Sequence, residues 1–171
     1  MSAGVVMRDD VVIRDARDPG DIPVIRRLFE AYAASLDVDL CFQNFAQELA
    51  ALPGDYAPPR GALLLAGRGD AHVGCVALRP LGDEAQATVG EVKRLYVVPH
   101  ARGTRTGRAL MHALIERARV IGYDELKLDT LATMTSARAL YASLGFAECA
   151  PYYPNPLPGV GYLALTLQPR S

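Results

Sequence analysis

The chain lacks several features that would point to particular classes of protein. It has no tryptophan and only three cysteines, Cys41, Cys75 and Cys149, which are odd in number and far apart. This pattern argues against a disulfide framework and a zinc site, and it favours a reducing, cytoplasmic setting. No apolar run approaches the roughly 18 residues that a membrane span requires, and the first ten residues hold no long apolar segment. We therefore expect neither export nor a membrane partner.

An excess of charge of either sign is also absent. Lysines and arginines number 18 against 19 acidic residues, which gives a formal net charge of -1. Such a balanced chain is not expected to bind nucleic acid. Its 171 residues, half of them hydrophobic, suffice for one domain with a substantial core and are few for two. We expect residues 1–171 to form a single domain.

Hydrophobic periodicity predicts a mixture of strands and helices. The clearest helix carries Leu110, Leu114 and Ala118 on one face and ends at Gly122, a residue suited to a left-handed stop. Further helices are expected over 21–32, 42–52 and 137–144, and strands over 11–14, 62–66, 73–79, 91–98, 126–131 and 161–167. This order predicts a single-domain α/β fold with a mixed sheet.

One loop stands out between a strand and the clearest helix. Arg102-Gly103-Thr104-Arg105-Thr106-Gly107-Arg108 follows a strand that ends at Val98-Pro99. Such a junction brings unpaired N–H groups and the positive end of a helix dipole together, and the arginines add positive charge. A pyrophosphate would fit there, although an ordinary surface loop with solvated arginines has the same spacing. The loop lacks both the Gly-Lys-Ser/Thr ending of a Walker loop and the GxGxxG of dinucleotide-binding folds.

Two segments together resemble a known family. KRLYVVPHARGTRTGRAL is similar to the acetyl-CoA-binding region of the GNAT superfamily of N-acetyltransferases, whose signature is Arg/Gln-x-x-Gly-x-Gly/Ala after a strand ending in Val-x-Pro. ARALYASLGF, at 137–146, resembles the family's later helix and strand. The resemblance covers residues 90–147 and implies a mixed, mostly antiparallel sheet flanked by helices.

The resemblance also implies acetyl-CoA as acetyl donor and no cofactor metal. In the family, a bulge in the strand before the loop frees backbone groups that bind the pantetheine arm. By analogy Leu95, Tyr96 and Val97 would form that surface, and residues 102–108 would hold the pyrophosphate. Two positions depart from the family pattern. Arg105 stands where a glycine is expected, so a positive φ there would be strained, and Met134 replaces a common asparagine.

Two residues are candidates for proton transfer. Glu91, on the strand before the loop, is the candidate base for the attacking amine, acting through water. It also fits a solvated glutamate or a partner of Lys93 or Arg94. Tyr141 matches the family tyrosine that protonates the leaving thiolate, and it also fits an ordinary core tyrosine. Cys75 lies in an apolar strand, which favours direct transfer over a route through a cysteine.

The acceptor is expected on the opposite side of the sheet, near residues 37–45 and 151–159. Asp37 and Asp39 would attract a cationic amine, and Phe42, Tyr152 and Tyr153 would line a wall. The same acids also fit solvated positions, and the tyrosines fit a core cover or a dimer contact. We expect an N-acetyltransferase acting on a primary amine of a small molecule or peptide, with a homodimer as an open possibility. A non-catalytic CoA-binding or sensing domain is the alternative, and a protein-interaction domain ranks last.

Overall fold

A seven-stranded sheet forms the centre of the molecule. The computed structural model describes residues 11–36, 38–40, 44–83 and 86–168. The strands are β1 (Val12–Asp15), β2 (Ala62–Arg68), β3 (Ala71–Pro80), β4 (Val89–Val97), β5 (Glu125–Thr130), β6 (Ala147–Glu148) and β7 (Gly161–Thr166). Their spatial order is β1-β2-β3-β4-β5-β7-β6, and β4 and β5 run parallel while the other neighbours pair antiparallel. The mixed, mostly antiparallel sheet expected from the sequence is confirmed.

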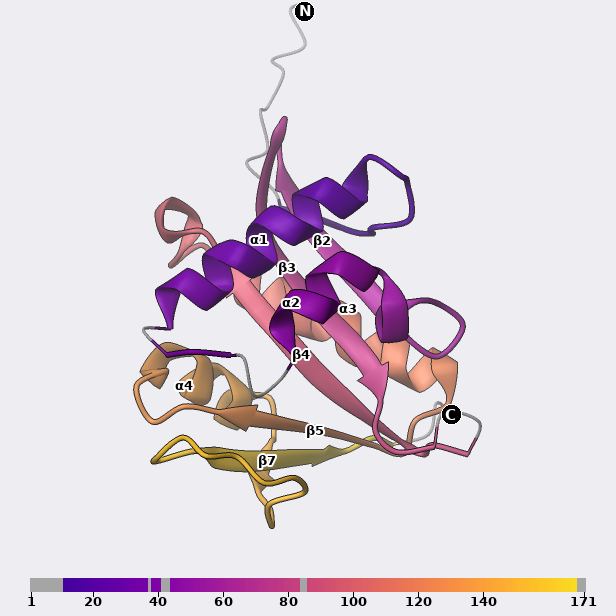
Figure 1. Ribbon diagram of the computed structural model, residues 1–171, viewed down its shortest axis with the longest axis vertical. Coiled ribbons are helices and arrows are strands. Elements are labelled where there is room, and N and C mark those ends of the chain that lie inside the picture. The colour runs from indigo at the N-terminus through magenta and orange to yellow at the C-terminus, as the bar shows by residue number, and fades with distance from the viewer. Residues whose placement is uncertain (1–10, 37, 41–43, 84–85, 169–171) are drawn as a thin grey trace, which may run out of the picture.

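Helices cover both faces of this sheet (Figure 1). They are α1 (Asp21–Ser35), α2 (Phe45–Ala51), α3 (Thr106–Ile121) and α4 (Thr135–Ser143), with short 3-10 turns η2 (Gly54–Tyr56) and η3 (Pro99–Ala101). Ile25 and Phe29 of α1 belong to one hydrophobic core, and Leu110 and Leu114 of α3 belong to another. Because all four side chains are fully buried, the apolar faces of both helices lie where their periodicity predicted.

The ends of the helices agree with the sequence pattern in most places. Gly122 ends α3 with a φ of +107°, which glycine adopts without a steric penalty. α2 begins at Phe45, inside the expected range 42–52. The structure adds a short strand, β6, directly after α4, which is too brief to produce a periodic signal.

Strand β4 contains a bulge at Arg94, whose φ is +60°. The pairing of β4 with β3 changes register there, because Cys75 lies opposite Tyr96 whereas Ala77 lies opposite Lys93. One extra residue on β4 is therefore accommodated between these pairs. The bulge implied by the family resemblance is present.

The bulge changes which side chains share a face. Regular alternation along β4 would place Val92 and Tyr96 on the same face, but they lie on opposite faces. Val92 packs in the α3 core together with Leu95, while Tyr96 packs in the α1 core. An inserted residue reverses the alternation of every side chain that follows it, and the sequence pattern alone does not mark where it occurs.

Strands β4 and β5 separate halfway along their length. Their parallel pairing covers only Val89 to Glu91 on β4, opposite Glu125 to Lys127 on β5. β4 then continues to Val97 without β5 as a paired neighbour. The sheet therefore opens along the second half of β4, on the side away from β3.

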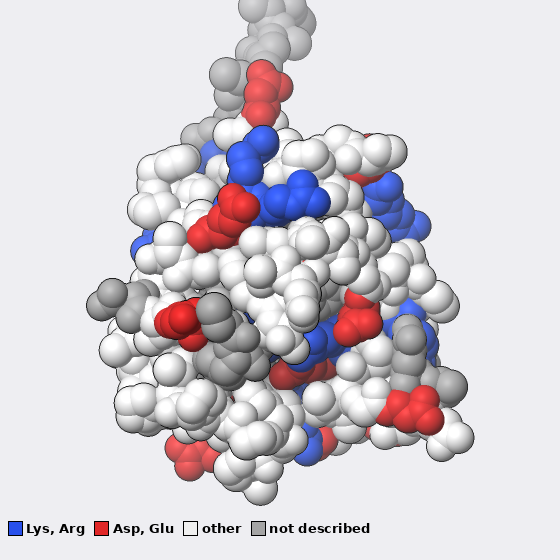
Figure 2. Space-filling view, viewed as in Figure 1, with Lys and Arg blue, Asp and Glu red and all other residues white. Residues whose placement is uncertain are grey.

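Charged side chains of both signs lie interspersed on the face that carries α1 and α2 (Figure 2), in keeping with the net charge of -1. Among the helices of the described ranges, none is long and apolar enough to cross a membrane.

Candidate active site

The arginine-rich loop forms the N-terminal end of α3. Gly103 has a φ of +80° and Arg105, the residue directly before the helix, has a φ of +65°. Arg105 makes no side-chain hydrogen bond that caps the helix. The Thr104 hydroxyl instead donates to the Ala101 carbonyl and lies 2.8 Å from the Thr106 hydroxyl. The first N–H groups of a 16-residue helix are therefore available to an anion.

Two of the loop arginines are held by neighbouring groups. Arg102 donates from Nε to the Val97 carbonyl at 3.0 Å, and its guanidinium lies 5.8 Å from the centre of the Tyr96 ring. Arg108 donates to the Ser143 hydroxyl at 2.8 Å, which links α3 to α4. These contacts fix two positive charges at the entrance of the opening between β4 and β5.

A cleft of about 720 Å³ runs from this loop along β4. Of the ten residues predicted to contact the cofactor, all except Thr104 line it. A Cβ added to Gly107 would lie 3.4 Å from Leu140 Cδ2 and 3.8 Å from Val97 Cγ2, which both line the cleft. A larger side chain at Gly107 would therefore extend into the cleft. The volume and the anion-binding end suit an elongated ligand with a pyrophosphate.

The backbone of β4 offers hydrogen-bonding groups to the cleft. The Val98 N–H donates to the Val73 carbonyl at 2.9 Å, so Val98 and Tyr96 direct their backbone groups toward β3. Since these directions alternate along a strand, Leu95 and Val97 direct theirs into the opening. A ligand arm lying there can pair with β4 as an additional strand.

The structure adds cleft residues that the sequence did not indicate. The end of α1 contributes Tyr32, Ser35 and Leu36, and the start of α4 contributes residues 133–137. Only Met134 among them had been singled out, as a departure from the family pattern. The α1 residues carry no local signal, because they reach the cleft only through the packing of α1 across β4.

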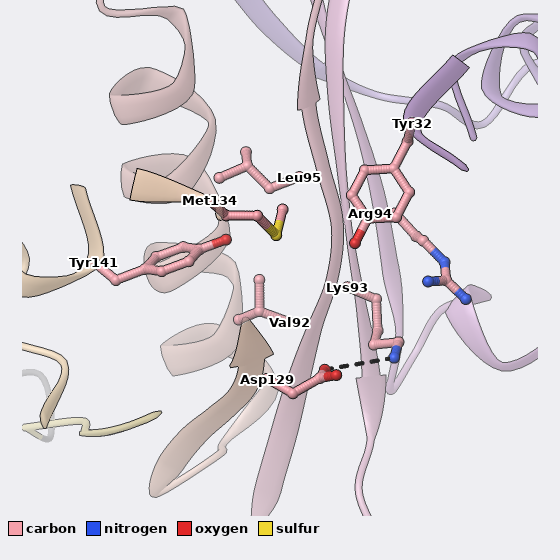
Figure 3. A pocket seen from close by; sticks show the side chains of 8 residues that line it. All are labelled: Tyr32, Val92, Lys93, Arg94, Leu95, Asp129, Met134 and Tyr141. Atoms are coloured by element: carbon pink, nitrogen blue, oxygen red, sulfur yellow. Dashed lines mark ion pairs between the residues drawn. The ribbon is translucent and has the colours of Figure 1, made fainter. Parts of the chain in front are cut away.

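A small chamber adjoins the cleft at the bulge of β4. Its volume is about 30 Å³, room for little more than one water-sized group. Figure 3 shows Tyr141 reaching toward β4 from the α4 side, and Lys93 and Tyr32 on the other side of the strand. The chamber is lined by Tyr32, Val92, Lys93, Arg94, Leu95, Asp129, Met134 and Tyr141.

Tyr141 is buried and its ring packs against Phe146 at 5.7 Å between centres. Burial raises the pKa of its hydroxyl, since an ionised phenol loses solvation there. The group therefore stays protonated at neutral pH. It is both a core residue and a hydroxyl directed into the chamber, so the two interpretations of Tyr141 are compatible.

Glu91 is not a solvated residue, because it is only 1% exposed. Its hydrogen-bonding partners differ from the two residues that the sequence suggested, although its charge acts on one of them, Lys93. Arg79 donates to Oε1 at 2.8 Å, and the Tyr152 hydroxyl donates to Oε2 at 2.7 Å. Glu91 does not line the chamber. A proton from the chamber reaches it only through another group.

Lys93 and Asp129 form the polar wall of the chamber. Lys93 Nζ lies 3.8 Å from Asp129 Oδ1, and the lysine side chain is 5% exposed. The second oxygen of Asp129 accepts from the Tyr153 hydroxyl and, at 3.4 Å, from Asn155. Burial lowers the pKa of Lys93, which the neighbouring Glu91 and Asp129 carboxylates partly oppose.

Arg94, at the bulge, forms an ion pair with a residue of α2. It donates to both carboxylate oxygens of Glu48 in α2, at 3.0 and 3.1 Å. The Tyr56 hydroxyl donates to Glu48 at 2.8 Å. α2 is thereby attached to β4 beside the chamber.

The predicted acceptor residues are only partly brought together. Tyr152 and Tyr153 lie beside the chamber through Glu91 and Asp129, and both rings also pack against Tyr162. Asp39 is exposed and lines neither the cleft nor the chamber, and Asp37 and Phe42 are outside the described residues. The two tyrosines pack as a cover of the core, which the sequence also allowed, and their role toward an acceptor stays a prediction.

Cys75 is fully buried in β3, where burial raises the pKa of its thiol. It lines neither cavity, so it is unsuited to act as a nucleophile. Within the residues that the structure describes, histidine, cysteine and carboxylate side chains form no group of three that would hold a metal ion.

Comparison with known proteins agrees with this geometry. The model of the acetyltransferase (GNAT) family matches residues 25–146. An uncharacterised N-acetyltransferase of Schizosaccharomyces pombe is 38% identical over 161 residues, which cover 92% of this chain and 96% of the relative.

Solved structures share the fold. A GNAT-family acetyltransferase of Staphylococcus aureus has a TM-score of 0.75 at 18% identity, over 93% of this chain and 100% of its own. An acetyltransferase of Salmonella typhimurium, solved with its cofactor acetyl-CoA, has a TM-score of 0.66 at 20% identity, over 94% and 96% of the two chains.

Proposed function

Because this chain belongs to the GNAT family of acetyltransferases, we propose that it moves an acetyl group from acetyl-CoA to a primary amine by direct attack in a ternary complex. As a member of the family it is an acetyl-CoA-dependent acyltransferase. The amine acceptor and the ternary complex are our proposal. The observation that carries it is that the cleft lined by the N-terminal end of α3 and the chamber lined by Tyr141 share wall residues, namely Tyr32, Leu95 and Met134.

The residues fit acetyl-CoA in the following way. The loop from Arg102 to Arg108 and the first N–H groups of α3 would bind the pyrophosphate. The segment Leu95-Tyr96-Val97 would bind the pantetheine arm through the backbone groups of Leu95 and Val97, and the thioester would then face the chamber. A bound thioester supplies an activated acetyl group. A fixed backbone N–H near the bulge would stabilise negative charge on the acetyl oxygen as the amine attacks.

Two side chains are proposed to manage protons. Tyr141 would donate to the leaving sulfur, supported by its protonated, buried hydroxyl in the chamber. The Glu91 carboxylate would stabilise, by its negative charge, the proton that the attacking amine releases. Its two hydrogen bonds keep it outside the chamber, so this role requires an intermediate carrier.

The acceptor would enter from the α1 and α2 side of the sheet. We propose a small-molecule or peptide amine, recognised near Tyr152 and Tyr153, with Asp39 and Phe42 on the connection between α1 and α2. We also propose that residues 1–171 form one catalytic domain, with a homodimer and a cytoplasmic setting as parts of the same hypothesis. The burial of Cys75 supports a direct transfer without a covalent enzyme intermediate.

Initial rates of CoA release test the ternary complex. With acetyl-CoA and an amine varied together, double-reciprocal lines should intersect, and Cys75→Ala should retain activity. Parallel lines, or loss of activity in Cys75→Ala without unfolding, would indicate a covalent intermediate. A purely sensing domain would bind acetyl-CoA and release no CoA with any amine.

A further inference from the structure

Lysine is rare in this chain. Of the 18 basic residues only two are lysines, Lys93 and Lys127. Arginine keeps its proton at every accessible pH, whereas a buried lysine can lose its proton. One of the two lysines occupies a buried position on β4, in the wall of the chamber.

Lys93 lies where an attacking amine has to approach. The thioester would lie along β4 on the side of Leu95 and Val97, and Tyr141 approaches from that side. Lys93 lies across the strand, toward α1, where the acceptor would enter (Figure 3). Lys93 lines the chamber together with Tyr141, whereas Glu91 does not line it.

We infer that Lys93 is the catalytic base, that it takes the proton of the attacking amine inside the chamber, and that Asp129 is a positioning residue that stabilises the ammonium formed. This inference rests on the proposed function. Lys93 would accept this proton directly, and the Glu91 carboxylate, two residues earlier on β4, would stabilise the resulting ammonium by its charge. Asp129 is itself held by Tyr153 and Asn155, which leaves Oδ1 directed at Lys93 Nζ.

The protons and bonds balance as follows. The acceptor enters as the neutral amine, having released one proton to solvent. Its nitrogen forms the C–N bond and becomes positively charged, and it then passes its second proton to neutral Lys93. The C–S bond breaks, and the sulfur takes the Tyr141 proton. Net transfer of one proton from Lys93 to Tyr141, directly or through solvent, restores both groups.

The charges around Lys93 support a change of protonation during turnover. Burial disfavours its ammonium form, and Arg79 and Arg94 act in the same direction, whereas Glu91 and Asp129 oppose them. The other titratable groups that face this region are Tyr32 from α1, Glu48 from α2, Tyr141 from α4, and Tyr152 and Tyr153 from the loop before β7. The Glu91 and Asp129 carboxylates would stabilise the ammonium form of Lys93 after it accepts a proton.

The low lysine content permits a direct measurement. In a Lys127→Arg variant, Lys93 is the sole lysine, so isotope labelling of lysine gives one side-chain NMR signal in the full chain without any ligand. We expect this signal to titrate below the ordinary lysine pKa of 10.5, and to titrate lower still after Asp129→Asn. A signal that stays protonated up to 10.5 or beyond would overturn the inference.

Turnover gives a second readout. Lys93→Arg carries a permanent positive charge and cannot accept a proton, so it should lower the rate of methylamine acetylation about 10²-fold, as Lys93→Met should. Hydroxylamine, of similar size and weakly basic, should lose much less, and the control Lys127→Arg should retain full rate. Full activity in folded Lys93→Arg would contradict a base. Acetyl-CoA binding, measured separately by calorimetry, shows whether the proposed function itself has failed.

Discussion

At the scale of single residues, the site depends on polar groups that are buried and hydrogen-bonded. Glu91, Lys93 and Arg94 look like a solvent-exposed charged segment in the sequence, yet each is buried and each meets an opposite charge. Removing one member of such a pair leaves an uncompensated charge in the interior, which is costly. Their chemistry is therefore fixed by neighbours that lie far away in the sequence.

Tyr141→Phe tests the proton donor. The change removes one hydroxyl from the chamber and keeps the ring contact with Phe146, so stability should be nearly unchanged. Turnover should fall by about 10²-fold while the KM for acetyl-CoA stays close to wild type. Steady-state CoA release, with thermal unfolding as the check on folding, measures both. A full rate in the folded variant would leave Tyr141 with a packing role alone.

Lys93 should also make stability depend on pH. Its pKa is lowered in the folded chain, so between that lowered value and 10.5 the unfolded chain binds more protons. The free energy of unfolding therefore gains a contribution that rises with pH over this interval. Denaturation at several pH values should show the rise in wild type relative to Lys93→Met. Lys127→Met controls for the loss of one charge, and parallel curves for wild type and Lys93→Met would contradict the prediction.

At the scale of elements, most of the fold was predictable. The apolar stripes of α1 and α3 and the stop at Gly122 follow from periodicity and turn chemistry, and the loop before α3 follows from its motif. The bulge in β4 was not visible in the pattern, and it places Val92 and Tyr96 on opposite faces. Asp129 was also missed, because it reads as an ordinary strand residue until β5 is placed beside β4.

Arg105 is the strained position of the loop. A non-glycine residue in the left-handed region costs about 1 kcal/mol or more, and Arg105 has a φ of +65°. Arg105→Gly should therefore be more stable than Arg105→Ala by about 1 kcal/mol, since both lose the same side chain beyond Cβ. Urea denaturation measures the difference. Equal stabilities would show that the backbone there is not strained.

At the scale of the whole molecule, the site lies at a junction within one sheet. β1 to β4 form one part of the sheet and β5 to β7 form the other, and one hydrophobic core joins Leu110 of α3 to Leu126 of β5 and Tyr141 of α4. Direct pairing of β4 with β5 covers only three residue pairs, and beyond it the two parts diverge to form the cleft. The cleft is therefore a consequence of topology, which explains why the sequence indicated its loop and not its walls.

The central claim is that this cleft binds acetyl-CoA through the loop before α3. Calorimetric titration of the full chain with acetyl-CoA and with CoA tests it most directly, repeated with Gly107→Glu. The variant places bulk and negative charge beside Leu140 and Val97. Gly20→Glu is the matched control, because Gly20 has a φ of -69° and open space around it, away from the cleft.

We predict that wild type and Gly20→Glu bind both ligands, and that Gly107→Glu loses binding by at least about 10²-fold while remaining folded. Absence of binding to wild type, or undiminished binding to Gly107→Glu, would contradict the account.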